Sequence, residues 1–319
     1  MKNNIFILFF ALALMCCKKD LQSDILDNYF FDMEQKCDSD TMPTQSGFQP
    51  GAMLYTYTTD DFEYPSFNPN NSEELIYCNK KYSPTLTYEI FILNRVDLSK
   101  RLLTTMQISS PPKWGKNGWI LLNAGKIYKI KENGDSLQAI ASGYSSEWNF
   151  DCTKFAYTTI NEVTHKTIGV IYDVNTTMKD TLPFTLASHN SWQNKNNLLL
   201  FYSDQPSYEG FNIVDINLQK RMRIWHITSS APPCWLNEDE FVYIWQQKLY
   251  KFSIPDNTST CIAQFCKNDF AIFLSYSHLS KELITSVEHE KYIGNGTIEV
   301  ADKIMILNFN DNSVTYINP

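Results

Sequence analysis

The sequence predicts an all-β protein, a six-bladed β-propeller of four-stranded antiparallel blades. Three observations predict it. A unit made of an aromatic residue, a polar turn and an apolar strand recurs six times along the 319 residues. Its period of roughly 34 to 47 residues is the period of propeller blades. Two further strands follow each unit, and the last is the most polar, as expected of an outer strand that faces water.

Each repeat begins at an aromatic anchor. In the first repeat Phe67 precedes a polar turn at 68–71 and an apolar strand at 75–77. The six anchors are Phe67, Trp114, Trp148, Trp192, Trp235 and Tyr276. Because large aromatic rings bury on the order of 150–250 Å² each, we expect the anchors to wedge between neighbouring blades. A β-sandwich has no reason to repeat one such unit, and a β-solenoid would use shorter rungs.

The second, third and fourth strands follow in order. Apolar second strands are expected at 75–77, 119–122, 155–157, 198–202, 241–244 and 283–284. Alternating third strands are expected at 90–93, 127–130, 168–172, 211–214, 249–252 and 304–307. Most then reach a turn rich in Asp, Asn or Gly, as tight hairpins require. More polar fourth strands are expected at 101–104, 137–140, 221–224, 260–263 and 313–317, and the pattern is blurred near 178–182 in the third repeat.

Two closures of the ring are compatible with this pattern. Residues 53–57 alternate like a strand and precede the first repeat. They could supply the outer strand of the last blade and so join the two ends of the chain. Alternatively, residues 313–317 form that outer strand and 53–57 flank it.

The amino-terminal segment has the features of an export signal. Lys2 precedes an uncharged apolar run at 5–15. The run is too short for a membrane-spanning helix, which needs about 20 residues, and has the length of a signal-peptide core. Leu14 and Cys17 have the spacing of the lipobox of bacterial lipoproteins, which this segment resembles, whereas Cys16 would put Ala13 at the Leu position. The alternative is an ordinary secretory signal with incidental cysteines.

The lipobox resemblance implies lipid attachment at Cys17 and anchoring in a membrane, since several acyl chains anchor firmly. The charged residues 18–20 resemble the export signals of Bacteroidetes surface lipoproteins, which implies an outer-membrane lipoprotein that is periplasmic or surface-exposed. We expect a signal peptide at 1–16, a tether at 17–50 and the propeller at 51–319. The tether contains apolar residues, Phe31 among them, and is expected to dock partly on the propeller.

The first repeat also resembles a known family. Residues 65–71, with Pro65, Phe67 and Pro69, precede the apolar strand at 75–77 and are similar to the WD40-like repeat of TolB-type propellers. That family uses its propellers for periplasmic protein contacts, for substrate gating in peptidases and in some sugar-acid lyases, so the resemblance implies the fold and leaves the function open. The tether is too short for the separate amino-terminal domain of TolB, and no hydrolase domain is expected after the last strand.

Charge and motifs exclude several classes of function. Lys and Arg number 27 against 35 Asp and Glu, a net charge of −8, whereas nucleic-acid binders need clustered cations. The sequence has no Gly-rich phosphate loop, no Gly-x-Ser-x-Gly elbow and no paired histidines at metal-ligand spacing. We therefore expect no catalytic residues, no cofactor and no metal.

The cysteines make a disulfide possible. Eight are present, and an exported protein meets an oxidising compartment. Cys261 and Cys266 are close enough in sequence to pair across a turn. Cys78 and Cys234 lie in strand patterns, where a free thiol behaves as a small hydrophobe.

The candidate binding site is the axial mouth of the propeller. Residues just ahead of the inner strands point toward the pore, so the mouth is expected to involve Tyr64, Lys113, Glu147, His189 and Asn190. Lys113 and Glu147, in adjacent repeats, are expected to face each other. We interpret the protein as a monomeric, non-catalytic scaffold that presents this face to a protein or glycan partner in the cell envelope. The alternative is a carbohydrate-active lyase or hydrolase that uses the axial pocket.

Overall fold

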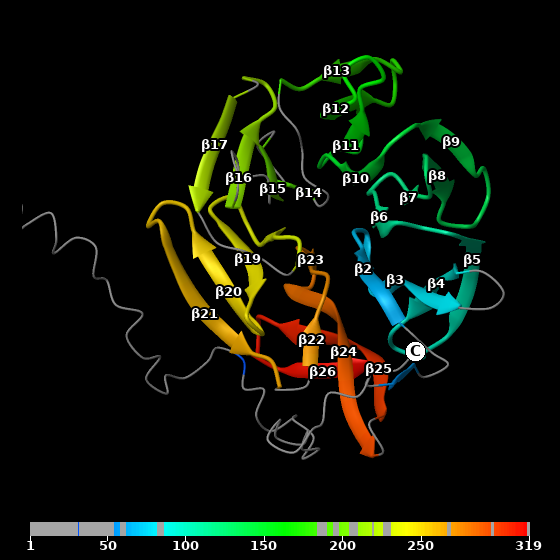
Figure 1. Ribbon diagram of the computed structural model, residues 1–319, viewed down its shortest axis with the longest axis vertical. Coiled ribbons are helices and arrows are strands. Elements are labelled where there is room, and N and C mark those ends of the chain that lie inside the picture. Colours follow the sequence, from blue (N-terminus) through cyan, green and yellow to red (C-terminus); the bar gives the residue numbers. More distant parts are fainter. Residues whose placement is uncertain are drawn as a thin grey trace, which may run out of the picture.

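The computed structural model is a six-bladed β-propeller, so the predicted fold class is confirmed (Figure 1). It describes residues 31, 54–57, 62–81, 86–183, 190–193, 198–203, 210–218, 220–225, 231–266, 269–294 and 297–317. Five blades are four-stranded antiparallel meanders, and the sixth contains a longer sheet. The inner strands surround a common axis, and the outer strands lie at the rim (Figure 1).

The first three blades follow one another along the chain. Blade 1 consists of β2 (Phe62–Asn68), β3 (Asn71–Lys81), β4 (Thr87–Asn94) and β5 (Lys100–Met106). Blade 2 consists of β6 (Ser110–Trp114), β7 (Trp119–Asn123), β8 (Ile127–Lys131) and β9 (Gln138–Ala141). Blade 3 consists of β10 (Tyr144–Trp148), β11 (Lys154–Ile160), β12 (Thr167–Asp173) and β13 (Lys179–Thr181). The blurred fourth strand of the third repeat is therefore real but short.

The last three blades complete the ring. Blade 4 consists of β14 (Asn190–Trp192), β15 (Leu198–Ser203), β16 (Gly210–Asp215) and β17 (Lys220–Trp225). Blade 5 consists of β18 (Cys234–Trp235), β19 (Glu240–Trp245), β20 (Lys248–Ser253) and β21 (Thr258–Gln264). Blade 6 consists of β23 (Ser275–Ser277), β24 (Glu282–Gly294), β25 (Thr297–Asn308) and β26 (Val314–Ile317).

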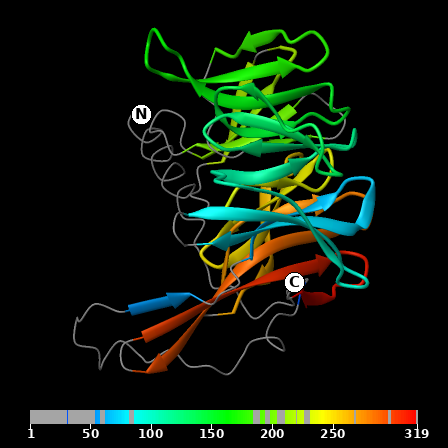
Figure 2. The ribbon, with the colours of Figure 1, turned by 90° about the vertical axis from the view of Figure 1, so that its right-hand side faces the viewer.

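The sixth blade settles which closure the chain uses. β26 pairs antiparallel with β25 and is the outer strand of the blade. β1 (Leu54–Tyr57) pairs parallel with the beginning of β25, at Thr297–Val300, so it flanks the outer strand. On the opposite side, β22 (Asp269–Ala271) pairs with β24. The long β24–β25 hairpin thus projects from the ring and carries a short strand on each edge (Figure 2).

The seam between blades 6 and 1 is closed by side chains. Apolar residues of β2 and β3, among them Phe67 and Tyr77, pack against Ile284 and Ile306 of blade 6. The Ser66 and Ser275 hydroxyls lie 3.1 Å apart across the seam. Arg95 Nη2 lies 2.7 Å from Glu282 Oε2, which forms an ion pair between the two blades.

Loss of that ion pair is expected to destabilise the ring. Arg95→Met leaves the largely buried Glu282 carboxylate without its cation, and we expect a loss of about 1.5–3 kcal/mol in the free energy of unfolding. The control is Lys81→Met, which removes the exposed pair between Lys81 and Glu89 at 3.7 Å and is expected to cost about 0.2–1 kcal/mol. Urea unfolding measures both, and equal losses would contradict a specific role for the seam pair.

The core is formed by apolar side chains that alternate between the two faces of each second strand. In β3, Ile76 and Cys78 face blade 2, whereas Leu75 and Tyr77 face blade 6. Successive side chains of a strand point to opposite faces of the sheet. One apolar strand therefore packs against both neighbouring blades. Among the described residues the buried side chains form six clusters, one at each junction between adjacent blades.

Five of the six aromatic anchors are buried between blades, as predicted. Phe67, Trp114, Trp148, Trp192 and Trp235 are buried, and Tyr276 is half-buried. The Trp148 indole N–H donates to the Lys113 carbonyl of blade 2 at 3.1 Å. The Trp235 indole N–H donates to the Ser191 carbonyl of blade 4, also at 3.1 Å. Each acceptor directly precedes the tryptophan of the preceding blade, so the indoles bridge neighbouring inner strands.

The one described residue of the tether, Phe31, is docked on the propeller. Its side chain is fully buried between blades 5 and 6. Its N–H donates to the Ile262 carbonyl at 2.9 Å, and its ring makes an edge contact with Phe309 at 5.0 Å. Residue 31 of the expected tether segment therefore packs on the propeller. Cys17 lies outside the described residues.

The pairing of Cys261 with Cys266 that their sequence spacing allowed does not form. Cys266 is disulfide-bonded, but Cys261 keeps its thiol, which donates to the Ala263 carbonyl. The reason is the extended strand β21, which runs from Thr258 to Gln264. Each strand residue advances the chain by about 3.3 Å, so no turn brings the two cysteines together. The disulfide partner of Cys266 lies outside the described residues.

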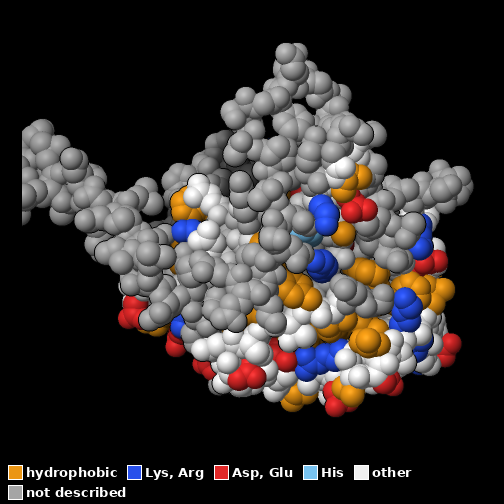
Figure 3. Space-filling view, turned by 90° about the horizontal axis from the view of Figure 1, so that it is seen from below, with side chains coloured by type: hydrophobic (Ala, Val, Ile, Leu, Met, Phe, Trp, Pro, Cys, Tyr) orange, Lys and Arg blue, Asp and Glu red, His pale blue; other side chains and the backbone are white. Residues whose placement is uncertain are grey.

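Within the described ranges no helix has the length and apolarity needed to cross a membrane. Seen from below the view of Figure 1, Lys and Arg side chains are interspersed with acidic and hydrophobic ones on the described surface (Figure 3).

Candidate functional site: the axial mouth

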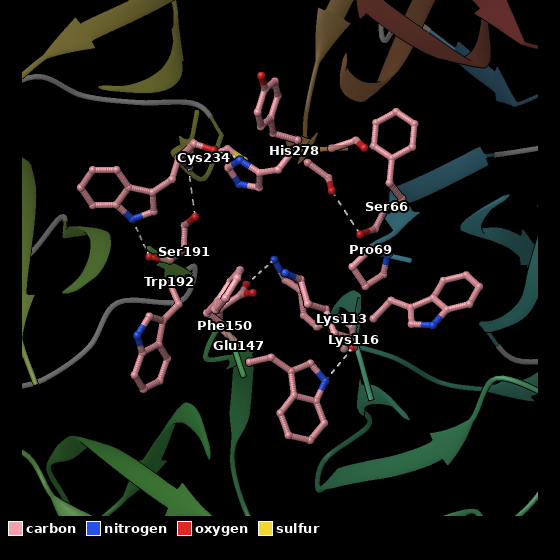
Figure 4. Close-up of a pocket in the computed structure, with 18 of the residues that line it drawn as sticks. Ser66, Pro69, Lys113, Lys116, Glu147, Phe150, Ser191, Trp192, Cys234 and His278 are labelled. Carbon is pink, nitrogen blue, oxygen red and sulfur yellow. Dashed lines mark hydrogen bonds and ion pairs between the residues drawn. The ribbon is translucent and has the colours of Figure 1, made fainter. Parts of the chain in front are cut away.

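A cavity of about 330 Å³ opens at one end of the propeller axis (Figure 4). All six blades line it, through the inner strands and the turns that follow them. Its labelled side chains in Figure 4 are Ser66, Pro69, Lys113, Lys116, Glu147, Phe150, Ser191, Trp192, Cys234 and His278. The cavity is therefore framed by a rigid sheet scaffold.

Lys113 and Glu147 face each other in this cavity, as expected from their positions in adjacent repeats. Lys113 Nζ lies 2.6 Å from Glu147 Oε2. The inner strands β6 and β10 each contain a register shift just before these residues, and such bulges re-aim side chains. Burial raises the pKa of the Glu147 carboxyl more than the Lys113 ammonium lowers it.

The other predicted mouth residues lie elsewhere or are not described. Tyr64 does not line the cavity: its ring packs against Phe273 at 4.4 Å and Tyr88 at 5.8 Å, between blades 1 and 6. Its backbone φ of 60° rotates it away from the regular strand direction. Asn190 begins the inner strand β14, where it pairs with Phe201. His189 lies outside the described residues.

Lys116 is a mouth residue that sequence reasoning missed. It lies in the turn after Trp114, and its ammonium sits 3.6 Å from the centre of the Phe150 ring. Its N–H donates to Cys152 Sγ at 3.1 Å, and its carbonyl accepts from the Asn70 side chain at 2.9 Å. Blades 1 and 3 thus hold this turn of blade 2 from both sides.

Gly115 allows this close packing. A Cβ on Gly115 would meet Trp148 Nε1 at 2.9 Å and Cys152 Sγ at 3.0 Å. The first distance is shorter than real Cβ contacts and the second is very tight, so the turn that carries Lys116 favours a glycine there. The glycine between two mouth residues is the sequence signal that could have drawn attention to this turn.

Cys234 and His278 are titratable groups in the same cavity. Burial raises the pKa of the Cys234 thiol to about 12, with the Lys113 ammonium lowering it less. Burial, together with the charges of Lys281 and Lys116, lowers the pKa of His278 to about 4. At neutral pH the cavity therefore presents a thiol and an uncharged imidazole.

The depressed pKa of His278 makes the folded state sensitive to acid. As pH falls from 6.5 to 4, the unfolded chain takes up a proton at this side chain that the folded chain resists, so stability is lost over that window. We expect His278→Gln to lose less stability than the unsubstituted protein between these pH values. Urea unfolding at several pH values measures this difference, and parallel pH curves would show that His278 does not contribute.

A smaller cavity of about 30 Å³ continues along the axis below the mouth. Ser66, Lys113 and Ser275 line both cavities. The Lys113 side chain thus lies where the two spaces adjoin. In the described part of the chain, no three His, Cys, Asp or Glu side chains are close enough to hold a metal ion together.

The fold and its axial cavity define the class of protein, a six-bladed β-propeller. No protein-family model matches the sequence, and no curated protein matches it. Among solved structures, the putative TolB from Agrobacterium tumefaciens is 13% identical with a TM-score of 0.54, over 68% of this chain and 83% of that one.

Two further solved structures show the range of this fold. TolB from Acinetobacter baumannii is 15% identical with a TM-score of 0.53, over 65% of this chain and 56% of that one. An oligogalacturonate lyase in complex with manganese is 10% identical with a TM-score of 0.51, over 81% of this chain and 77% of that one. This chain therefore spans little more than half of the Acinetobacter protein, and these likenesses establish the fold alone.

Proposed function

We propose that this protein is a lipid-anchored binding scaffold of the bacterial cell envelope, held in the outer membrane through Cys17, with the axial mouth as its binding face. The observation that carries the proposal is the mouth cavity, to which all six blades contribute side chains. A concave site on a rigid scaffold is the usual form of a binding site. The partner is a protein or a glycan of the envelope.

The docked tether supports a position close to the membrane. Between Cys17 and Phe31 there are 14 residue steps, which span roughly 46–50 Å when fully extended. Because Phe31 is buried between blades 5 and 6, a lipid on Cys17 would keep the propeller within that reach of the bilayer. TolB-like structural neighbours also favour an envelope role.

Mass spectrometry of the mature protein from the membrane fraction tests the anchor. We expect a mature chain that begins at Cys17 and carries acyl mass, and a Cys17→Ala variant that leaves the membrane fraction. A mature chain that begins after Ala13 without acyl mass would refute the anchor.

Affinity capture from the native envelope tests the binding face. Leu279 is exposed at the mouth, whereas Val163 is exposed in the turn between β11 and β12. We expect Leu279→Glu to lose the captured partner and Val163→Glu to keep it. If both variants capture equally, the mouth is not the binding face.

One observation favours the enzymatic alternative, a carbohydrate-active lyase or hydrolase. Glu147 lies in a cavity with a raised carboxyl pKa, and such groups serve as general acids. If the protein cleaves envelope or extracellular polysaccharide, Glu147→Gln should abolish product formation without loss of folding. If the unsubstituted protein releases no product from either acidic or neutral polysaccharides, the enzymatic alternative is refuted and the scaffold function remains.

A further inference from the structure

Cys266 forms a disulfide, and its partner is none of the other cysteines that the structure describes. Cys266 is disulfide-bonded, whereas the remaining described cysteines keep free thiols, namely Cys78, Cys152, Cys234 and Cys261. The chain contains eight cysteines. The partner is therefore one of three residues of the amino-terminal segment: Cys16, Cys17 or Cys37.

Cys266 lies at the junction between blades 5 and 6. It follows β21, the outer strand of blade 5, by two residues. Its carbonyl accepts from the Asp269 N–H at 2.9 Å, and Asp269 begins β22, which pairs with β24 of blade 6. The cysteine is 8% exposed. A segment that is bonded to Cys266 therefore has to reach the end of the outer strand of blade 5.

The tether reaches the same junction through Phe31. Its N–H donates to the Ile262 carbonyl of β21 at 2.9 Å. Its side chain belongs to the cluster that contains Phe265, the residue directly before Cys266. The backbone contact at Ile262 lies only four residues before Cys266. Phe31, the described residue of the tether, is thus already held close to this cysteine.

Cys37 is within reach of Cys266 from this contact. It follows Phe31 by six residues, and six residues span at most about 20–22 Å when extended. From Ile262 to Cys266 the chain advances by four residues, which is about 13 Å at strand spacing. A disulfide requires Cα atoms within about 7 Å of each other. The segment is therefore long enough to bring the two sulfur atoms together.

We propose that Cys37 is the partner of Cys266 and that this disulfide clamps the tether onto the junction between blades 5 and 6. The choice among the three cysteines rests on the proposed lipid anchor. Signal cleavage would remove Cys16, and a thioether to the lipid would occupy the Cys17 sulfur. Cys37 also closes the shortest loop from Phe31, and shorter loops cost less conformational entropy.

The bond forms by exchange with a second disulfide. A thiolate of the pair attacks a sulfur of a disulfide-bonded oxidoreductase of the envelope, and the mixed disulfide that results is then attacked by the other thiolate. One S–S bond forms in this chain and one breaks in the oxidoreductase. The two sulfurs of the oxidoreductase take up the two electrons, together with the two protons that the thiols of Cys37 and Cys266 release.

The clamp changes how the propeller is held. The bond closes a covalent loop that contains blades 1 to 5, and a cross-link stabilises the folded state mainly by restricting the unfolded chain. With Phe31 it fixes the tether to the propeller at two points. A pull on the lipid is then borne by the junction between blades 5 and 6 before it reaches β1.

Peptide mapping of the full protein from its native envelope tests the assignment. Free thiols are alkylated in denaturant, and the chain is then digested without reduction and analysed by mass spectrometry. We expect the peptides that contain Cys37 and Cys266 to be linked, and the other described cysteines to be alkylated. A link from Cys266 to Cys16 or Cys17, or an alkylated Cys266, would overturn the proposal.

Matched cysteine variants test the clamp. Cys37→Ser is expected to leave Cys266 open to alkylation, to unfold at lower urea and to be cleaved faster ahead of residue 54 in limited proteolysis. Cys261→Ser is the control, since Cys261 keeps its thiol and lies in β21 beside the same junction. We expect the control to keep the linked peptides and to be cleaved at the rate of the unsubstituted protein. Equal cleavage of both variants would show that the bond does not hold the tether.

Failure of this inference is distinguishable from failure of the proposed anchor. A link between Cys37 and Cys266 in a mature chain without acyl mass upholds the clamp and refutes the anchor. An acylated Cys17 together with an alkylated Cys266 does the reverse.

Discussion

Trp235→Ala is expected to lower the free energy of unfolding by about 3–5 kcal/mol, the range for removal of a large aromatic side chain from a core. Trp235 is 2% exposed and belongs to the cluster between blades 4 and 5. Its ring centre lies 5.9 Å from that of Phe241 in an edge-to-face contact. The substitution removes this packing and leaves the Ser191 carbonyl without its indole donor.

Two companion variants keep the prediction testable. Trp235→Phe retains most of the ring and removes the hydrogen bond, so we expect a smaller loss and a folded protein. Trp119→Ala removes a half-buried indole that carries Lys129 and Lys131 on its face, and we expect a clearly smaller loss than at Trp235. Urea unfolding followed by circular dichroism measures all three. Similar losses for Trp235→Ala and Trp119→Ala would contradict the wedge role of the anchor.

Phe31→Ala is also expected to have a large effect. We expect it to lower the free energy of unfolding by about 3–5 kcal/mol, provided that the surrounding residues do not collapse into the space left by the ring. Phe31 is fully buried although it lies more than 20 residues before the first strand described. Its ring fills the space between Ile262 of blade 5 and Phe309 of blade 6. The substitution is also expected to release the tether, because this side chain is its described contact with the propeller.

Urea unfolding and limited proteolysis measure these two consequences. We expect Phe31→Ala to unfold at lower urea and to be cleaved faster ahead of residue 54. The control is Phe270→Ala, since Phe270 lies in β22 and is 41% exposed, and its loss is expected to stay below about 1.5 kcal/mol. Unchanged stability of Phe31→Ala would show that the docked tether does not support the ring.

Much of the fold was predictable because each blade repeats the same local pattern of an aromatic anchor, alternating strands and polar turns. Trp148 and Trp192 were recognised as wedges from sequence, and both are buried between blades. Apolar runs such as the one in β3 alternate between two junctions, which a sequence pattern reveals directly. Asp and Asn side chains also accept from backbone N–H groups in the turns, as Asp173 does from Thr176 and Asn94 from Val96.

The candidate site was predictable only in part. Lys113 and Glu147 were found because both directly precede an anchor tryptophan. Lys116, Phe150 and His278 were missed because they lie in turns, and only the packing of three blades around the axis brings them into one cavity. Tyr64 was misplaced because a positive φ redirects it toward Phe273.

The sequence by itself determined the number of blades, their strand order and the burial of five of the six aromatic anchors, because these follow from alternation and turn chemistry within each repeat. Only the tertiary structure decided how the ring closes, that Cys261 keeps its thiol, and which turns meet at the mouth. These features join residues far apart in the chain, as Arg95 and Glu282 are. No local pattern specifies such contacts, since they depend on where the last blade meets the first.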